Sequence, residues 1–138
     1  MRYLKCFCLA MLIAAMLEVA LVQAQIFRAR AVGHYRRGAM FMLDRMADPA
    51  QVFGCTRVVL VGSVVSVEYD NKKQIVSFSQ QARNGGVQKL VLPKLLYEQQ
   101  LPVEAEIGLG RLVDKGKRLR VVAYDCRGSL QVDQIKAL

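Results

Sequence analysis

The stretch R-V-V-L-V-G-S-V-V-S-V-E-Y (57–69) decides the fold class of this chain. Seven of its thirteen residues are Val or Leu, and six of these are β-branched, which favours an extended, half-buried backbone over a helix. Gly62 lies in the middle, and a lone glycine inside a strand marks a bulge or a sharp bend. A long first strand that bends at its centre is what a small closed barrel needs.

Shorter strand patterns follow this stretch. They occupy residues 74–79, 88–92, 103–109 (V-E-A-E-I-G-L, a strict alternation), 118–125 and 130–135. Turn-forming residues separate several of them, at 70–73, 84–86 and 114–117. Residues 93–102 begin and end with proline and predict one or two helical turns. We therefore expect a mainly β domain, built as a small five-stranded closed barrel.

The chain before the barrel predicts three further parts. Residues 39–47 (A-M-F-M-L-D-R-M-A) are good helix formers with apolar residues at helical spacing, and predict a short N-terminal helix that covers the barrel. Residues 25–38 hold four arginines and predict a basic N-terminal arm, extended or loosely docked. Residues 1–24 have the pattern of a secretory signal peptide that is cleaved after Ala24. The single barrel domain with its leading helix then spans residues 39–138.

An uncleaved membrane anchor is the alternative for residues 1–24. Their apolar run is short for a bilayer span of about 20 residues, and Glu18 interrupts its end. No other segment of the sequence is long and apolar enough to cross a bilayer, so we expect no transmembrane segment after cleavage. The expected location is the periplasm or the exterior of the cell.

The cysteines of the exported chain predict one disulfide. Cys6 and Cys8 leave with the signal peptide, whereas Cys55 and Cys126, 71 positions apart, remain as an even pair. Such a pair in a secreted chain forms a structural disulfide by default. Redox chemistry favours a C-x-x-C pair, which the sequence lacks, and the single His34 adds too few ligands for a metal site. We expect neither a metal nor a cofactor.

Several stretches carry a family resemblance. They are V-V-L-V-G-S-V-V-S-V (58–67), Q-I-V-S-F (74–78), V-E-A-E-I-G-L-G-R-L-V-D-K (103–115) and the late pair Val132 and Ile135. This pattern resembles the small periplasmic bacterial OB-fold proteins associated with stress responses (the BOF type), over roughly residues 56–135. The resemblance implies an OB-fold, the five-stranded Greek-key barrel, and a binding role without a catalytic motif.

The predicted disulfide raises a geometric objection to that fold. If the strands that carry Cys55 and Cys126 are the first and fifth of a simple OB barrel, they run parallel, and the two cysteines lie at opposite ends. A disulfide needs Cα atoms within about 7 Å of each other. Either the chain folds back over the barrel near one cysteine or the strand order differs, so another small closed barrel is the alternative fold.

Basic residues are the remaining functional signal. Without residues 1–24, the 20 basic and 11 acidic residues fall to 18 and 10, a net charge of +8. Two clusters are expected to bind an anionic partner: Arg28, Arg30, Arg36 and Arg37, and then Arg111, Lys115, Lys117, Arg118 and Arg120. The plain alternative is a solubilising surface. An acidic protein face or an anionic envelope component is the expected partner.

No group of side chains in the sequence predicts catalysis. The carboxylate pairs Glu104/Glu106 and Asp44/Asp48 lack the apolar setting that raises a carboxyl pKa for acid catalysis. We therefore expect a non-enzymatic binding or adaptor module of the bacterial envelope. The alternative is a nucleic-acid-binding OB-fold protein at the cell surface, in uptake or conjugation, although Phe78 is the only aromatic residue on the second and third strands. A small hydrolase is the third hypothesis.

Overall fold

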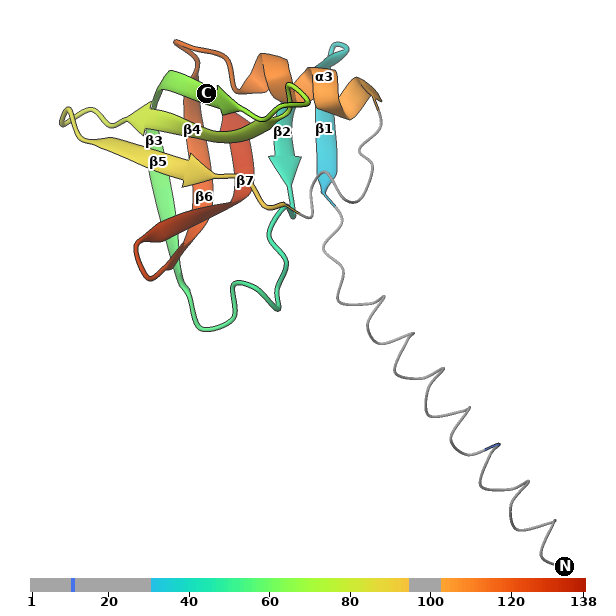
Figure 1. Ribbon diagram of the computed structural model, residues 1–138. Coiled ribbons are helices and arrows are strands. Elements are labelled where there is room, and N and C mark those ends of the chain that lie inside the picture. Colours follow the sequence, from blue (N-terminus) through green and yellow to red (C-terminus); the bar gives the residue numbers. More distant parts are fainter. Residues whose placement is uncertain (1–10, 12–30, 95–102) are drawn as a thin grey trace, which may run out of the picture.

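The computed structural model describes residues 11, 31–94 and 103–138 (Figure 1). Their elements are β1 (Val32–Arg36), β2 (Ala39–Asp44), β3 (Thr56–Tyr69), β4 (Ile75–Gln81), β5 (Val87–Val91), α3 (Val103–Leu112), β6 (Arg118–Cys126) and β7 (Ser129–Ala137). In this part of the chain, no helix reaches the length and apolarity that a bilayer crossing requires. Apart from residue 11, the predicted signal peptide lies outside the described residues, as do residues 25–30 of the arm and 95–102 of the predicted helical turns.

Five strands close into a barrel in the order β3-β4-β5-β7-β6, and β6 returns to β3. β3, β4 and β5 form an antiparallel meander, whereas β5 meets β7 in parallel through two residue pairs. Fully buried side chains from the barrel strands fill the interior, among them Phe78, Leu90, Leu119 and Ile135. The prediction of a mainly β protein with a closed five-stranded barrel is confirmed.

The long strand β3 pairs with two different strands, as its central glycine suggests. Its first half, from Thr56 to Ser63, pairs with β6, and its second half, from Ser63 to Tyr69, pairs with β4. The register to β6 runs through Gly62 without interruption, and the irregularities against β4 fall between Val64 and Ser66 and between Glu68 and Tyr69. The strand therefore changes partner at the glycine, while its irregularities lie a few residues later.

The predicted helix over residues 39–47 is wrong, because residues 39–44 form strand β2. β1 and β2 make an antiparallel hairpin, and β2 continues onto β7 through the pair Leu43 and Ile135. β5 covers only the beginning of β7, so the later part of that edge needs another partner. Pairing at this edge outweighs the helix propensity of the segment. The described part of the basic arm, residues 31–38, holds strand β1 and the turn that leads into β2.

The predicted strand over residues 103–109 is also wrong, because Val103–Leu112 is helix α3. Its buried residues are Ala105, Gly108, Leu109 and Leu112, which follow helical spacing. Glu104 and Glu106 lie in the first turn and Arg111 in the last, which suits the helix dipole. In Figure 1, α3 lies across one end of the barrel, next to β1 and β2.

With helix α3 in place of the predicted strand, a barrel of this kind no longer conflicts with a Cys55–Cys126 disulfide. Because α3 replaces a presumed strand, β6 is the fourth strand of the barrel and runs antiparallel to β3. Thr56 pairs with Asp125, so Cys55 and Cys126 are the next residues along the same ladder. Their Cα atoms are 4.8 Å apart and their sulfur atoms are bonded, which confirms the predicted disulfide.

Candidate anion-binding groove

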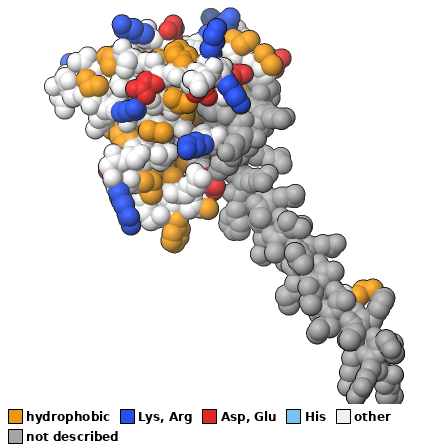
Figure 2. Space-filling model, viewed as in Figure 1, with side chains coloured by type: hydrophobic (Ala, Val, Ile, Leu, Met, Phe, Trp, Pro, Cys, Tyr) orange, Lys and Arg blue, Asp and Glu red, His pale blue; other side chains and the backbone are white. Residues whose placement is uncertain are grey.

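The nine basic residues predicted to bind an anion fall in different parts of the molecule. Arg36 and Arg37 lie at the β1–β2 turn, Arg111 in the last turn of α3, Lys115 and Lys117 in the turn before β6, and Arg118 and Arg120 on β6. Arg28 and Arg30 lie outside the described residues. In Figure 2, lysine and arginine side chains are spread over the visible face, with acidic and hydrophobic side chains between them. The predicted clusters therefore do not form one continuous basic surface on that side.

A groove of about 430 Å³ between α3 and the β1–β2 hairpin brings two of these residues together. Its walls place Arg111 and Lys117 beside Tyr35 and Ile107, whose side chains are 48% and 52% exposed. The rest of the lining is Gly38, Ala39, Met40, Glu104, Gly108, Leu112 and Ala137. We call this the α3–hairpin groove. Two cations next to exposed apolar surface suit a ligand that carries both negative charge and apolar groups.

The hairpin turn sets one rim of the groove. Arg37 and Gly38 both have positive φ angles, 52° and 77°, as a two-residue turn between antiparallel strands requires. Gly38 lines the groove, and the exposed side chains of Arg36 and Arg37 directly precede it. The turn therefore adds positive charge at the rim.

Close packing of α3 on β2 sets the floor. A Cβ atom added at Gly108 would lie 2.9 Å from Cε of Met40, which is closer than real side chains approach. Glycine at this position lets the helix lie directly on the strand. As a result, Ile107 and Arg111 on the neighbouring turns of the helix reach the groove beside the hairpin.

Arg118 and Arg120 lie on a different surface, the outer face of β3, β6 and β7. The register aligns Arg120 with Val61 on one side and with Lys136 on the other. Arg120 Nη1 donates a hydrogen bond to Gln134 Oε1 at 3.4 Å. Val61 is 41% exposed in this row. These residues give the face a mixed basic and apolar character, but they do not line the α3–hairpin groove.

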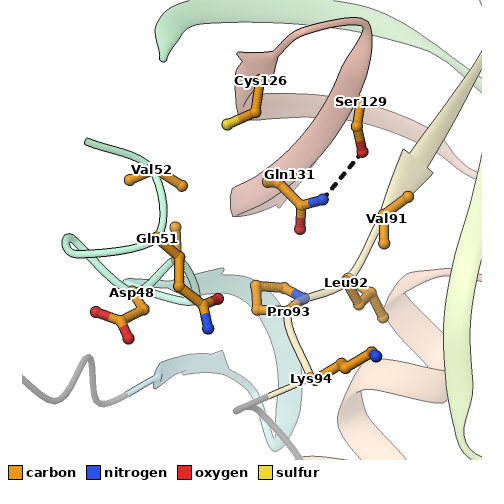
Figure 3. Close-up of a pocket in the computed structure, with 11 residues that line it drawn as sticks. Asp48, Gln51, Val52, Val91, Leu92, Pro93, Lys94, Cys126, Ser129 and Gln131 are labelled. Carbon is orange, nitrogen blue, oxygen red and sulfur yellow. Dashed lines mark hydrogen bonds between the residues drawn. The ribbon is translucent and has the colours of Figure 1, made fainter. Parts of the chain in front are cut away.

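A second hollow, of about 360 Å³, lies at the disulfide end of the barrel (Figure 3). Polar side chains of Asp48, Gln51, Lys94 and Gln131 line it together with the apolar Leu92 and Pro93, and Gln131 Nε2 donates to Ser129 Oγ at 3.0 Å. Because Lys94 is matched by Asp48, this hollow has no excess of positive charge. It is a weaker candidate for an anionic partner than the α3–hairpin groove.

The outer face of β4 and β5 offers no stacking platform for nucleic-acid bases. Phe78 is the only aromatic residue of these two strands, and its side chain points into the core and is 1% exposed. The outward residues near it are polar: Ser77 Oγ donates to Glu68 Oε2 at 2.7 Å, and Lys89 Nζ lies 2.9 Å from the same oxygen. Single-strand binding by OB-folds depends on exposed aromatic side chains, so this face argues against the nucleic-acid alternative.

These contacts predict a measurable shift at Glu68. The hydrogen bond from Ser77, followed by the hydrogen bond and charge of Lys89, lowers the pKa of Glu68. Since the folded-state pKa lies below the unfolded one, the stabilisation is present above the ordinary glutamate pKa of about 4.3 and is lost as the pH falls through the lowered value. Ser77→Ala and Lys89→Gln should each raise the pKa of Glu68, because each substitution removes a contact that lowers it. NMR titration of the Glu68 carboxyl carbon measures both, and an unchanged pKa in Ser77→Ala would contradict the assignment.

Sequence reasoning found the cations of the groove but not its apolar walls. Tyr35 falls in the predicted arm and Ile107 in the predicted strand over residues 103–109, so the sequence does not place the two side chains at one site. The available signal was Gly108, since a glycine inside an amphipathic segment indicates close packing against another element. Among the described residues, no group of three or more His, Cys, Asp or Glu is arranged to hold a metal ion.

Comparison of the chain with protein-family models, curated proteins and solved structures found no match to any of them.

Proposed function

We propose that this protein is an exported, non-catalytic binding module whose α3–hairpin groove holds an acidic segment of a partner protein. The observation that carries the proposal is the meeting of Arg111 and Lys117 with exposed apolar side chains in one groove. An acidic segment with interspersed apolar residues satisfies both features. A small polar anion would leave the apolar walls unused.

The proposal includes an OB-fold for the barrel. Its support is the connectivity: an antiparallel meander of three strands, a helix, and two further strands that close the barrel, with the third and last strands parallel. The β1–β2 hairpin is an addition before the first barrel strand. Because α3 and this hairpin form the groove together, the proposed site lies outside the strand face on which OB-folds commonly bind oligonucleotides.

Export to the periplasm or the cell exterior is a further part of the proposal. It is supported by the leader pattern of residues 1–24 and by the Cys55–Cys126 bond, because disulfides persist mainly in oxidising compartments. A resemblance to stress-associated periplasmic proteins agrees with this location. The intact mass of the chain isolated from its own cells decides whether it begins at Gln25.

Reversing the two groove cations should weaken binding of an acidic peptide. The probe is a fluorescein-labelled octapeptide, Glu-Ser-Val-Ser-Glu-Ser-Val-Ser, which carries Glu and Val on one face when extended, and fluorescence anisotropy reports its affinity. We expect the double substitution Arg111→Glu/Lys117→Glu to weaken binding about tenfold or more at low salt, with a smaller effect above about 0.5 M salt, because salt screens exposed charges.

The matched control is Arg83→Glu/Arg127→Glu, which changes the net charge equally in two exposed turns outside the groove. It should weaken binding less than threefold or so, as general electrostatics predicts. Equal losses in the two double variants would contradict the groove. A single-stranded oligonucleotide of the same length is the second probe, and tighter binding of it than of the peptide would favour the nucleic-acid alternative.

A further inference from the structure

β1 is the one strand in the described part of the sheet that has a neighbour on a single side. The barrel strands close on one another, and β2 lies between β1 and β7. Within the described residues, β1 makes no backbone hydrogen bonds except those to β2. Among residues 31–94 and 103–138, nothing pairs with the N–H and C=O groups on the outer side of β1, and another strand can add to such an edge.

This edge is continuous with the α3–hairpin groove. Tyr35 of β1 pairs with Met40 of β2, and the Met40 side chain packs against Gly108 of α3. Because cross-strand partners point to the same face of a sheet, Tyr35 also faces the helix side, where it lines the groove. The residue of an added strand that pairs with Tyr35 would point to this side as well, toward the groove that holds Arg111 and Lys117.

The charge around the edge selects the occupant. β1 ends at Arg36, the turn adds Arg37, and Glu104 is the one acidic side chain among the described residues that line the groove. A second copy of the chain carries the same net charge, +9, or +8 after the expected cleavage. An acidic strand is complementary, whereas a second copy is opposed by like charge. β1 has five residues and a register irregularity between His34 and Tyr35, which also disfavours extensive self-pairing.

We infer that the partner's acidic segment binds as an extended strand that adds to the outer edge of β1, with alternate side chains directed into the α3–hairpin groove. This inference rests on the proposed function and specifies the shape of the ligand. Main-chain hydrogen bonds to β1 supply affinity, and the groove selects acidic and apolar residues on the face of the added strand that points into it.

Backbone methylation of the probe peptide tests strand addition directly. In a strand, the N–H groups of alternate residues point to the same edge. Two versions of the octapeptide are made, one N-methylated at its glutamates and valines and the other at its serines, and both are titrated against the full disulfide-bonded chain. We expect one version to bind about 30-fold or more weakly and the other within about threefold of the unmethylated peptide, because only one set of N–H groups faces β1.

Equal binding by both methylated peptides, or equal loss in both, overturns strand addition. If both methylated peptides bind equally well but Arg111→Glu/Lys117→Glu still weakens peptide binding, the proposed groove function stands without strand addition. If the unmethylated peptide does not bind at all, both the groove function and strand addition are wrong. Amide hydrogen exchange of the complex provides a second readout. Alternate amides of Val32–Arg36 should gain protection with the unmethylated peptide, and no gain at β1 contradicts the inference.

Discussion

Removing the disulfide should lower the free energy of unfolding by about 4 kcal/mol, which is a large share of the stability of a small domain. The bond joins residues 71 apart, so it closes a loop that includes most of the barrel. In the folded state it extends the ladder between β3 and β6 by one residue pair. Urea unfolding of the Cys55→Ser/Cys126→Ser variant, compared with the oxidised chain, measures the difference.

Reduction provides the control for this prediction. The wild-type chain in excess reductant should unfold near the midpoint of the double variant, and reductant should leave the variant unchanged. Equal stability of the oxidised and reduced chains would show that the bond constrains little of the unfolded ensemble. For protein isolated from its own cells, an intact mass two hydrogens below that of the dithiol is the expected result.

Most barrel strands could be predicted because their signals, residue composition and turn residues, are local. The disulfide could be predicted because few cysteines remain to be paired. Residues 57–69 are rich in β-branched side chains. The turns at 70–73 and 84–86 contain turn-forming residues: Asp70, whose Oδ1 accepts hydrogen bonds from the N–H groups of Lys72 and Gln74, and Gly85, with a φ angle of 86°. With only Cys55 and Cys126 left after the predicted cleavage, one pairing is possible. These predictions need no knowledge of the distant parts of the chain.

The two wrong elements have a different origin. The run V-E-A-E-I-G-L fits both a strand and a helix, because short apolar patterns do not separate the two periods. Extending the pattern to Leu112 would have favoured the helix, since Ala105, Leu109 and Leu112 lie on one helical face. For β2, no local signal was available. Its strand conformation depends on the edge of β7 that β5 leaves unpaired, and this edge exists only in the closed barrel.

The candidate groove depends on both of those elements, which explains why its composition could not be predicted. Arg111 and Lys117 are close in sequence and were expected to be neighbours. Their position opposite Tyr35 requires that residues 103–112 be helical and that the hairpin pair with β7. A binding site assembled from added elements around a barrel is therefore less visible in a sequence than the barrel itself.

Gly62→Ala should destabilise the protein by about 3 kcal/mol, because the added methyl group has no room. Its Cβ would collide with the carbonyl oxygen of Gln81 and would lie 2.8 Å from Cγ of Gln80. The Gln80 side chain, 3% exposed, extends from β4 past Gly62 and donates a hydrogen bond from Nε2 to the carbonyl oxygen of Leu119 on β6, at 3.1 Å. Alanine therefore displaces backbone as well as a buried hydrogen bond.

Gly110→Ala is the matched control, since the same methyl group added in α3 meets nothing within 4 Å. Helix propensity predicts that this variant gains about 0.5 to 1 kcal/mol. If the two substitutions change the free energy of unfolding in opposite directions, the loss at Gly62 is due to the close approach of β4 and not to a general effect of replacing glycine. If Gly62→Ala unfolds at the wild-type urea midpoint, then β4 does not lie against β3 as closely as the structure has it. The change of β3 from pairing with β6 to pairing with β4, on which closure of the barrel depends, would then need another explanation.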